Sequence, residues 1–180
     1  VQAIMGSTAR SAATIEEFQT ALIGRISALS KTHVLLSDDS RPVLLGDIAR
    51  SELDAFDDGS EGRIRLNGPP VEINAQTAVS LGLAMHELTT NAAKYGALSV
   101  HDGKIDLRWS ETITADKRQL DFDWVESGGP AVKAPERQGF GSRLLNFVLP
   151  GQIQAKVNVD YHPGGLRVHG TVPLPAKAAD

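Results

Sequence analysis

Segment 86–96 of the chain, His-Glu-Leu-Thr-Thr-Asn-Ala-Ala-Lys-Tyr-Gly, carries residue types that suit phosphate and metal chemistry. Read as a helix, it places Glu87, Asn91 and Lys94 at spacings of four and three residues, along one narrow polar stripe. Carboxylate and carboxamide oxygens can hold Mg²⁺ or its waters, and an ammonium group can neutralise phosphate. The stripe therefore suits a magnesium-bound polyphosphate. A solvated helix face carrying the same ladder of residues is the ordinary alternative.

Two glycine-bearing segments downstream favour the phosphate interpretation. Segment 124–130, Trp-Val-Glu-Ser-Gly-Gly-Pro, follows an alternating strand, and its Gly-Gly pair lets backbone approach a flat ligand while Glu126 accepts from an exocyclic amine. Segment 139–144, Gly-Phe-Gly-Ser-Arg-Leu, leads two glycines into a helix, where N–H groups and the helix dipole favour an anion. Taken alone, the first segment is more typical of a plain turn, and the second is only weak evidence for a phosphate site. The prediction therefore depends on their combination.

The elements that must position these motifs follow from hydrophobic periodicity. An apolar stripe on the face adjoining the polar one predicts a packed helix over about 75–95: its members are Leu81, Ala84, Met85, Leu88 and Ala92. The region before about residue 56 is predicted to be helical, with Thr14 as an N-cap and a break at 37–42.

Beyond residue 59 the period changes to two, which indicates strands. Segments 64–66 and 71–73 are predicted to form a short hairpin across Asn67-Gly68-Pro69-Pro70. Further strands are predicted around 105–109, 120–124, 153–159 and 166–168, with a short helix from Gly141 to Leu149. Because several strands follow one another directly, we expect an α+β fold, a two-layer sandwich of a mixed or antiparallel sheet covered by helices.

Composition sets the remaining limits. The chain has 180 residues, 41% hydrophobic and 22% charged, which suits one ordinary soluble domain with a helical appendage. A net charge of −4 without a basic run argues against nucleic acid as a partner. Cysteine is absent, which excludes disulfides and thiolate metal sites and fits a cytoplasmic setting. No apolar run reaches the ~20 residues of a membrane span, no secretory leader is visible, and the start at Val1 suggests a fragment.

Taken together, the three motifs resemble the ATP-binding domain of GHKL-type histidine kinases. The closest resemblance is to the HWE histidine kinases, which carry a His in the N box and a Trp-x-Glu in the G1 box. His86 and the pair Trp124 and Glu126 match these features, and segment 139–144 is similar to the G2 box. The resemblance covers about residues 60–175. It implies residues 1–40 as part of the dimerisation and histidine-phosphotransfer helices, and 41–180 as the catalytic ATP-binding domain.

The resemblance also implies roles for single residues. Glu87 would be the catalytic residue that organises a metal-bound water, Asn91 would ligate Mg²⁺, and Lys94 would contact phosphate. Glu126 stands where relatives usually have an Asp that reads the adenine amine. The implied ATP-binding set comprises Asn91, Lys94, Tyr95, Glu126, Gly128, Gly139, Gly141, Ser142, Arg143 and, more weakly, His86, for which a packed, hydrogen-bonded role is equally well favoured.

A few positions are expected to play no nucleotide-binding role or differ from the pattern of the resembling family. Trp124 is predicted to be a core residue. Many relatives have a Thr or Ser after a Gly-Gly pair near the adenine, whereas Gly164-Gly165 is followed here by Leu166, and Thr171 is too distant to replace it. The lid between Gly129 and Gly139 is expected to be short.

The implied activity is that of a two-component sensor histidine kinase, which transfers the γ-phosphoryl group of ATP to a His and then to an Asp of a response-regulator receiver domain. The acceptor His is expected just before Val1, so that this segment alone binds Mg-ATP without phosphorylating itself. His33, near a helix end, is expected to cap or pack. An upstream sensor domain and a homodimer through the N-terminal helices are further expected partners.

The alternatives are a degenerate ATPase fold that serves phosphotransfer or docking without kinase activity, and other GHKL enzymes such as a serine-directed anti-sigma kinase or a chaperone-type ATPase. The intact polar stripe and glycine pairs disfavour the first alternative. The helical front end and the Trp-x-Glu turn disfavour the others.

Overall fold

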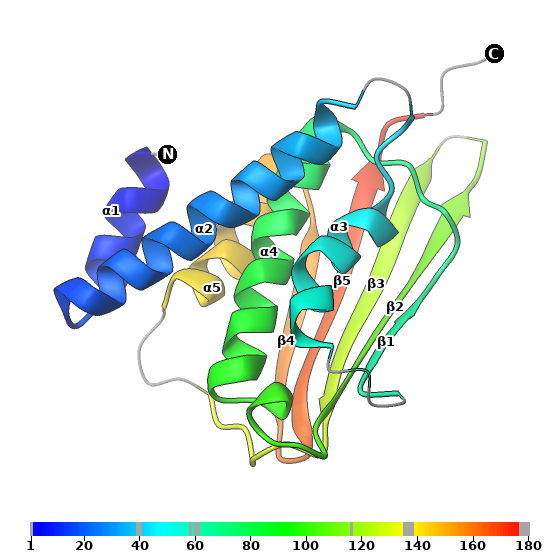
Figure 1. The fold of residues 1–180 in the computed structure, drawn as a ribbon. Helices are drawn as coiled ribbons and strands as arrows, with labels where there is room; N and C mark the ends of the chain where they lie inside the picture. The colour runs from blue at the N-terminus through cyan, green and yellow to red at the C-terminus, as the bar shows by residue number, and fades with distance from the viewer. Residues whose placement is uncertain are drawn as a thin grey trace.

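A computed structural model of the chain describes residues 2–38, 41–57, 59, 62–115, 117–134 and 139–176. Within these ranges a five-stranded sheet has the order β1-β2-β3-β5-β4 (Figure 1). The strand β1 runs parallel to β2, and the other neighbouring pairs are antiparallel. The mixed sheet expected from consecutive strands is thereby confirmed. The strands are β1 (Ile64–Asn67), β2 (Lys104–Ile113), β3 (Arg118–Ser127), β4 (Lys156–His162) and β5 (Gly165–Leu174).

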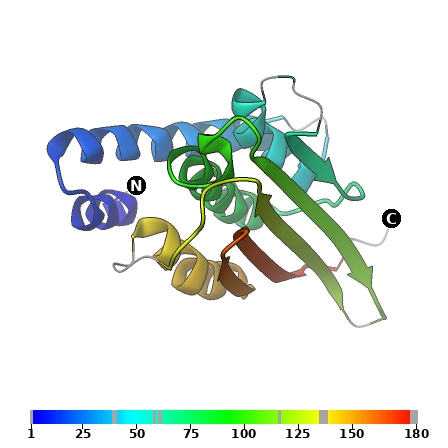
Figure 2. The same cartoon turned by 90° about the horizontal axis from the view of Figure 1, so that it is seen from below.

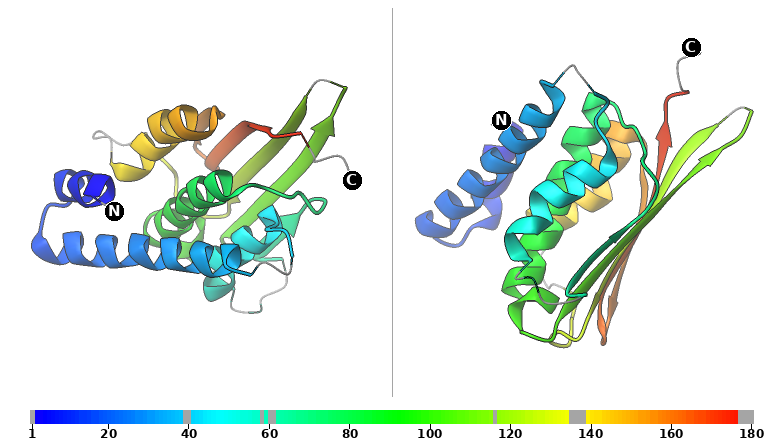
Figure 3. Two further views of the ribbon diagram at one scale, coloured as in Figure 1. Left: turned by 90° about the horizontal axis from the view of Figure 1, so that it is seen from above. Right: turned by 45° about the vertical axis from the view of Figure 1, so that its right-hand side comes forward.

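Helices cover one face of this sheet in two successive layers (Figures 1 and 3). The layer next to the sheet contains α3, α4 and the run from α5 to α6, and the pair α1 and α2 packs outside it (Figure 2). The bounds are α1 (Gln2–Ser11), α2 (Ile15–Leu36), α3 (Leu45–Leu53), α4 (Ala75–Lys94), α5 (Phe140–Arg143) and α6 (Leu149–Ile153), with 3-10 turns at Asp54–Phe56 and Ala97–Ser99. None of the helices in the described ranges is long and apolar enough to cross a membrane.

The core lies between the sheet and α4. The predicted apolar stripe of α4 is buried along its whole length, from Leu81 to Ala92. The strands present alternate residues to this helix, and Trp124 on β3 is fully buried, as predicted. Thr14 caps α2 by accepting from the Glu17 N–H, and Asn74 caps α4 by accepting from the Thr77 N–H. Local sequence signals therefore place the central helix and its packed face correctly.

The predicted hairpin over residues 64–73 is wrong. The strand β1 pairs with β2, and Val71 and Ile73 instead bond to the segment that enters α3, through Leu45 N to Val71 O and Ile73 N to Val43 O. Pro69 and Pro70 lack backbone N–H groups, so a ladder between the two arms would lose its donors next to the turn. The alternation of apolar residues was real, but their partners lie elsewhere in the chain.

The helix after Gly139 is longer than predicted. It begins at Phe140, passes through a π-helical segment at Leu144–Val148, and ends at Ile153, so that Ile153 belongs to α6 and the next strand starts at Lys156. Gln154 takes a left-handed conformation (φ 54°) at the helix end, which stops the helix and turns the chain into β4. Because Ile153, Ala155, Val157 and Val159 alternate along the sequence, the pattern predicted a strand that began within the helix.

The inward face of α2 consists of small and polar residues rather than of its branched ones. Arg25, Ala28 and Thr32 are buried, whereas Ile23 and Ile26 are 68% and 43% exposed. The apolar residues Phe18, Leu22, Ile26 and Leu29, which recur at helical spacing, are therefore only partly inward. Close helix packing explains this choice, because a Cβ at Gly82 of α4 would lie 2.5 Å from the Thr32 Oγ1 atom.

We predict that Gly82→Ala destabilises the protein although alanine favours helices. The added Cβ must displace the Thr32 hydroxyl, and overpacking of this kind costs about 1–3 kcal/mol. A helical glycine with open space around it, Gly151, serves as the control, because its Cβ would meet nothing within 4 Å. Urea unfolding should show a loss for Gly82→Ala and little change for Gly151→Ala. Equal midpoints for both variants would contradict the close contact between α2 and α4.

Candidate functional site

The last turns of α4 present the polar stripe, but its three residues lie in different environments. Glu87 is 6% exposed, whereas Asn91 and Lys94 are on the surface. Tyr95, which follows the helix, is 73% exposed. The stripe thus runs from a buried carboxylate outward to an exposed amide and an ammonium group. Such a gradient suits a ligand that enters from solvent and reaches inward to Glu87.

The glycine-led segment reaches this stripe from 50 residues further along the chain. A Cβ on Gly141 would lie 3.3 Å from the Asn91 Nδ2 atom and 3.4 Å from the Glu87 Oε2 atom. Gly141 is buried, and Gly139 is the N-cap residue of α5, without a side-chain cap. The N-box-like and G2-box-like segments therefore share one location, with backbone placed directly against the amide and the carboxylate.

Arg25 of α2 holds the Glu87 carboxylate. Its Nε and Nη2 atoms donate to Oε1 and Oε2 of Glu87 at 2.8 and 3.0 Å, and both side chains are more than nine-tenths buried. A bidentate guanidinium–carboxylate pair is among the strongest hydrogen-bonded arrangements in proteins. Sequence reasoning missed this contact because an isolated Arg in a helix usually marks a solvated face. The small residues Ala28 and Thr32 on the same face of α2 could have indicated that this face, including Arg25, is buried.

Two further residues fix the guanidinium group itself. The Nη1 atom donates to the Thr8 Oγ1 atom at 2.7 Å, and Thr8 in turn donates to the Ile4 carbonyl oxygen. The guanidinium carbon lies 3.9 Å from the centre of the Phe140 ring, within the range of a cation–π contact. Residues of α1, α2, α4 and α5 therefore meet around one buried ion pair.

His86 lies on a different face of α4 from the polar stripe. Its Nδ1 atom is 2.8 Å from the Glu52 Oε2 atom of α3, and Lys31 of α2 approaches Glu52 Oε1 at 3.5 Å. A Cβ on Gly24 of α2 would lie 3.0 Å from the His86 Nε2 atom. In the structure, His86 is therefore packed and hydrogen-bonded to Glu52. It is not among the nearest neighbours of Gly141.

Glu126 lies near the end of β3 and is only 3% exposed. Its Oε1 atom accepts from the Trp124 indole N–H at 3.1 Å, and its Oε2 atom accepts from the Ala97 N–H at 2.9 Å. Burial raises the pKa of Glu126 above its ordinary value of 4.5, and these two hydrogen bonds oppose that rise. The indole hydrogen bond was not foreseen, because Trp124 was predicted only to fill the core.

The remaining predicted residues are placed as follows. Gly128 has a φ of 70°, and a Cβ there would lie 2.6 Å from the Asp102 carbonyl oxygen, so the turn after Glu126 requires glycine. Ser142 is half-buried and does not cap α5, and Arg143 is exposed. Part of the predicted lid, residues 135–138, lies outside the described residues.

His33 has the helix-end role expected for it, and Thr171 makes a hydrogen bond between neighbouring strands. The His33 Nδ1 atom is 3.0 Å from the Ser37 hydroxyl oxygen, and Ser37 closes the end of α2 through the His33 carbonyl oxygen. Thr171 donates to Asp121 on the neighbouring strand β3. Neither side chain contacts Glu87 or Glu126 in these hydrogen bonds.

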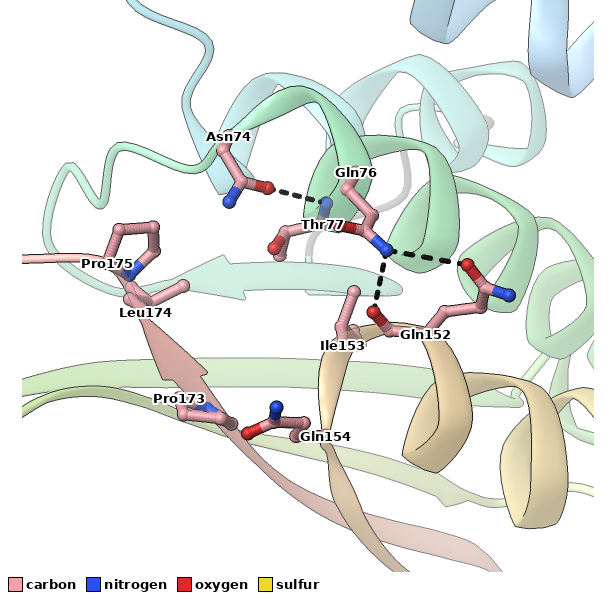
Figure 4. A pocket seen from close by; sticks show the side chains of 9 residues that line it. All are labelled: Asn74, Gln76, Thr77, Gln152, Ile153, Gln154, Pro173, Leu174 and Pro175. Atoms are coloured by element: carbon pink, nitrogen blue, oxygen red, sulfur yellow. Dashed lines mark hydrogen bonds between the residues drawn. The ribbon is translucent and has the colours of Figure 1, made fainter.

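A pocket of about 280 Å³ lies at the opposite end of α4 (Figure 4). Gln76 and Gln152 line it and are joined by the hydrogen bond from Gln76 Nε2 to the Gln152 carbonyl oxygen. Fifteen residues of helix separate Gln76 from Asn91, which corresponds to roughly 22 Å. The pocket is therefore separate from the site built around Glu87 and Gly141.

The donor set at Glu87 and Asn91 fits a magnesium ion that arrives with a polyphosphate. Mg²⁺ commonly keeps several waters and takes only one or two protein oxygens beside the substrate phosphates. Among the described residues there is no cluster of three or more His, Asp or Glu side chains that could hold a metal. One carboxamide with a nearby carboxylate is consistent with metal held jointly by substrate and protein.

We predict that Arg25→Met lowers the free energy of unfolding by about 3–5 kcal/mol, because it leaves the Glu87 carboxylate buried without its partner. The double variant Arg25→Met/Glu87→Met should recover most of this loss, since no charge remains buried. The exposed pair of Arg108 with Asp106 offers a control. Arg108→Met should leave the urea midpoint close to that of the unaltered protein. Urea unfolding measures all three, and a double variant as unstable as the single one would contradict a tightly coupled pair.

Comparison with known proteins gives a consistent result. Residues 1–70 match the family model described as HWE histidine kinase. A blue-light-activated histidine kinase of Brucella anthropi is 37% identical over 177 residues, covering 98% of this chain and 36% of the relative. A protein of the same name from Brucella abortus is 34% identical over 175 residues, covering 97% of this chain and 36% of the relative. The chain thus spans about a third of the length of these relatives.

Solved structures support the same fold. The histidine kinase domain of the blue-light-activated histidine kinase of Erythrobacter litoralis has a TM-score of 0.63 at 23% identity, covering 85% of this chain and 74% of that one. The catalytic domain of the histidine kinase ThkA has a TM-score of 0.53 at 14% identity, covering 74% of this chain and 96% of that one. The chain therefore has the same fold as these two histidine kinase domains. The HWE histidine kinase model thus matches the first 70 residues, and similarity along nearly the whole chain relates it to histidine kinases.

Proposed function

We propose that this chain is the ATP-binding catalytic segment of a sensor histidine kinase. It would bind Mg-ATP and transfer the γ-phosphoryl group to a histidine, from which a response-regulator Asp receives it. The observation that carries the proposal is the position of Gly141 against both Asn91 and Glu87. The backbone of one motif and the metal-and-phosphate side chains of another meet there, as a triphosphate site requires.

In this site Asn91 and Glu87 are the residues that would hold Mg²⁺ or its waters, and Lys94 would contact phosphate. The metal would neutralise phosphate charge and orient the oxygens. The protein's own share is positioning, because phosphoryl transfer needs little covalent chemistry from the enzyme. Gly139 and Gly141 would place backbone N–H groups beside the phosphates. Glu126 would accept from the adenine amine at the other end of the nucleotide, near Gly128.

The division into residues 1–40 and 41–180 is also proposed, with the first part contributing phosphotransfer helices. Such helices would pair with a second copy of the chain. Exposed apolar side chains on α2 are the ones such a pairing would cover: Ile15, Ile23, Ile26 and Val34. The proposed sensor lies in another part of a longer protein, and the segment itself is proposed to work in the cytoplasm.

A second candidate, a docking or phosphotransfer module without kinase activity, is favoured by one observation. Both Glu87 oxygens already accept from Arg25, so the proposed catalytic carboxylate is held in a buried ion pair that leaves one acceptor position on each oxygen. Kinase activity would require Glu87 to act while paired, or Arg25 to withdraw. Product analysis distinguishes the two candidates.

We predict that Asn91→Ala abolishes binding of Mg-ATP, because the amide oxygen that would hold the metal is lost while the surrounding fold is unchanged. Asn158→Ala on β4 removes an equally exposed amide far along the sequence and should bind Mg-ATP normally. Isothermal titration calorimetry on the three proteins measures this. Equal affinities for the Asn91 variant and the unaltered protein would overturn the metal-site assignment.

We also predict that a chain extended to include the residues preceding Val1 forms phosphohistidine from Mg-ATP. The radiolabelled product should be lost in acid and retained in base. His33→Gln should leave the yield unchanged, because His33 closes a helix end through Ser37. An acid-stable product would indicate a hydroxyl acceptor. Absence of any product from a protein that binds ATP would favour the docking module.

A further inference from the structure

The Glu126 carboxylate is held by two neutral donors from different segments. The Trp124 indole N–H approaches Oε1 from two residues earlier on β3, and the Ala97 N–H approaches Oε2 from the turn that follows α4. Trp124 is fully buried and Glu126 is 3% exposed, so both contacts are shielded from water. Neither donor carries a charge, in contrast with the guanidinium group that holds Glu87.

The backbone around Glu126 is shaped to admit this carboxylate. A Cβ on Gly96 would lie 2.1 Å from the Glu126 Oε2 atom, and one on Gly165 would lie 2.0 Å from the Glu126 carbonyl oxygen. Gly165 also has a φ of 136°, which side-chain-bearing residues rarely adopt. Gly96 and Gly165 thus lie against the side chain and the backbone of the same residue. The backbone around Glu126 therefore leaves a defined space for its carboxylate, and this space requires glycine at both positions.

Glutamate needs such a defined space more than aspartate would. Its carboxylate is one methylene further from the backbone and rotates about one more bond, so an unsupported Glu126 could adopt several orientations. The two donors remove that freedom. Each carboxylate oxygen has two acceptor positions, and the bonds from Trp124 and Ala97 use only one on each. Acceptor capacity in a fixed direction remains.

We propose that Trp124 is a specificity-determining positioning residue of the nucleotide site, which fixes the Glu126 carboxylate so that it selects a base carrying an exocyclic amine. The inference rests on the proposed ATP-binding function. A base amine can donate to the free acceptor positions, whereas a base carbonyl would direct an oxygen at a carboxylate. Sites built to bind an N–H group reject analogues without it far more strongly than sites built on shape alone.

A purely structural explanation for the indole hydrogen bond is weaker. A buried indole N–H needs an acceptor, but a backbone carbonyl oxygen is sufficient for that purpose. Trp109 on β2 illustrates it, because its indole donates to the Pro69 carbonyl oxygen at 2.8 Å. Trp124 instead donates to an ionisable side chain, the Glu126 carboxylate, two residues before Gly128. The two tryptophans therefore form a matched pair, one bonded to a proposed base-reading residue and one to backbone.

The test compares Trp124→Phe with Trp109→Phe, since each removes one indole N–H and keeps an aromatic ring. Calorimetry in Mg²⁺ measures the affinity for ATP and for purine riboside triphosphate, which lacks the exocyclic amine. We expect the unaltered protein to prefer ATP. Trp124→Phe should weaken ATP binding about tenfold, the effect of one well-placed hydrogen bond, while binding of the amine-free nucleotide stays within about twofold. Trp109→Phe should leave the ratio of the two affinities unchanged.

A second variant covers the case in which Trp124→Phe does not fold. Glu126→Asp keeps the charge and Trp124 but shortens the reach to both donors, and it should lower the same ratio. Equal weakening of both nucleotides in the folded variants would mean a structural role alone and would overturn the inference, as would an unchanged ratio. If the unaltered protein binds neither nucleotide, the proposed function itself is overturned, and the inference with it.

Discussion

The arrangement of this molecule depends on the buried ion pair between Arg25 and Glu87. Removing two charges from water is costly, and a buried pair persists only where its geometry is close to ideal and its remaining hydrogen-bonding groups are satisfied. Here the guanidinium group also binds Thr8 and lies against the Phe140 ring. One contact therefore fixes the helical front end relative to α4 and to the glycine-led helix. By linkage, any ligand that takes Glu87 from Arg25 must also weaken the docking of α2.

Such close approaches are possible because glycine stands at the crossing points. Gly141 brings backbone against Asn91 and Glu87, Gly82 admits the Thr32 hydroxyl between α4 and α2, and Gly96 leaves room for the Glu126 carboxylate. At each position a Cβ would meet a polar side-chain atom at 3.4 Å or less. At these positions the absence of a side chain, rather than the ability to form a turn, allows polar groups from remote segments to come into contact. The tolerance of the site to substitution is correspondingly low.

Local patterns predicted the parts of the fold that local physics controls. The central helix with its buried stripe, the Thr14 cap of α2 and most strands of the sheet follow from periodicity and capping chemistry. The meeting of the Asn91 and Gly141 motifs follows from the family resemblance. The hairpin failed because alternation identifies a strand but not its partner. Arg25 and Thr8 were missed for a related reason. A buried ion pair between residues 62 positions apart leaves no periodic trace, and an arginine within a helix has the same local appearance whether it faces water or a carboxylate.

In the proposed nucleotide site, Glu87 and Glu126 would adapt the same residue type to two tasks. Glu87 would lie near the phosphates, where an uncompensated carboxylate would repel a triphosphate, and its charge is balanced by a guanidinium group. Glu126 would face the base, where charge balance matters less than direction, and its two partners are neutral N–H groups in a setting where burial raises its pKa. A cation beside Glu126 would neutralise the charge that attracts a base amine. Neutral donors beside Glu87 would leave its charge unopposed. The choice of partner, rather than the choice of acid, therefore assigns each carboxylate its end of the nucleotide.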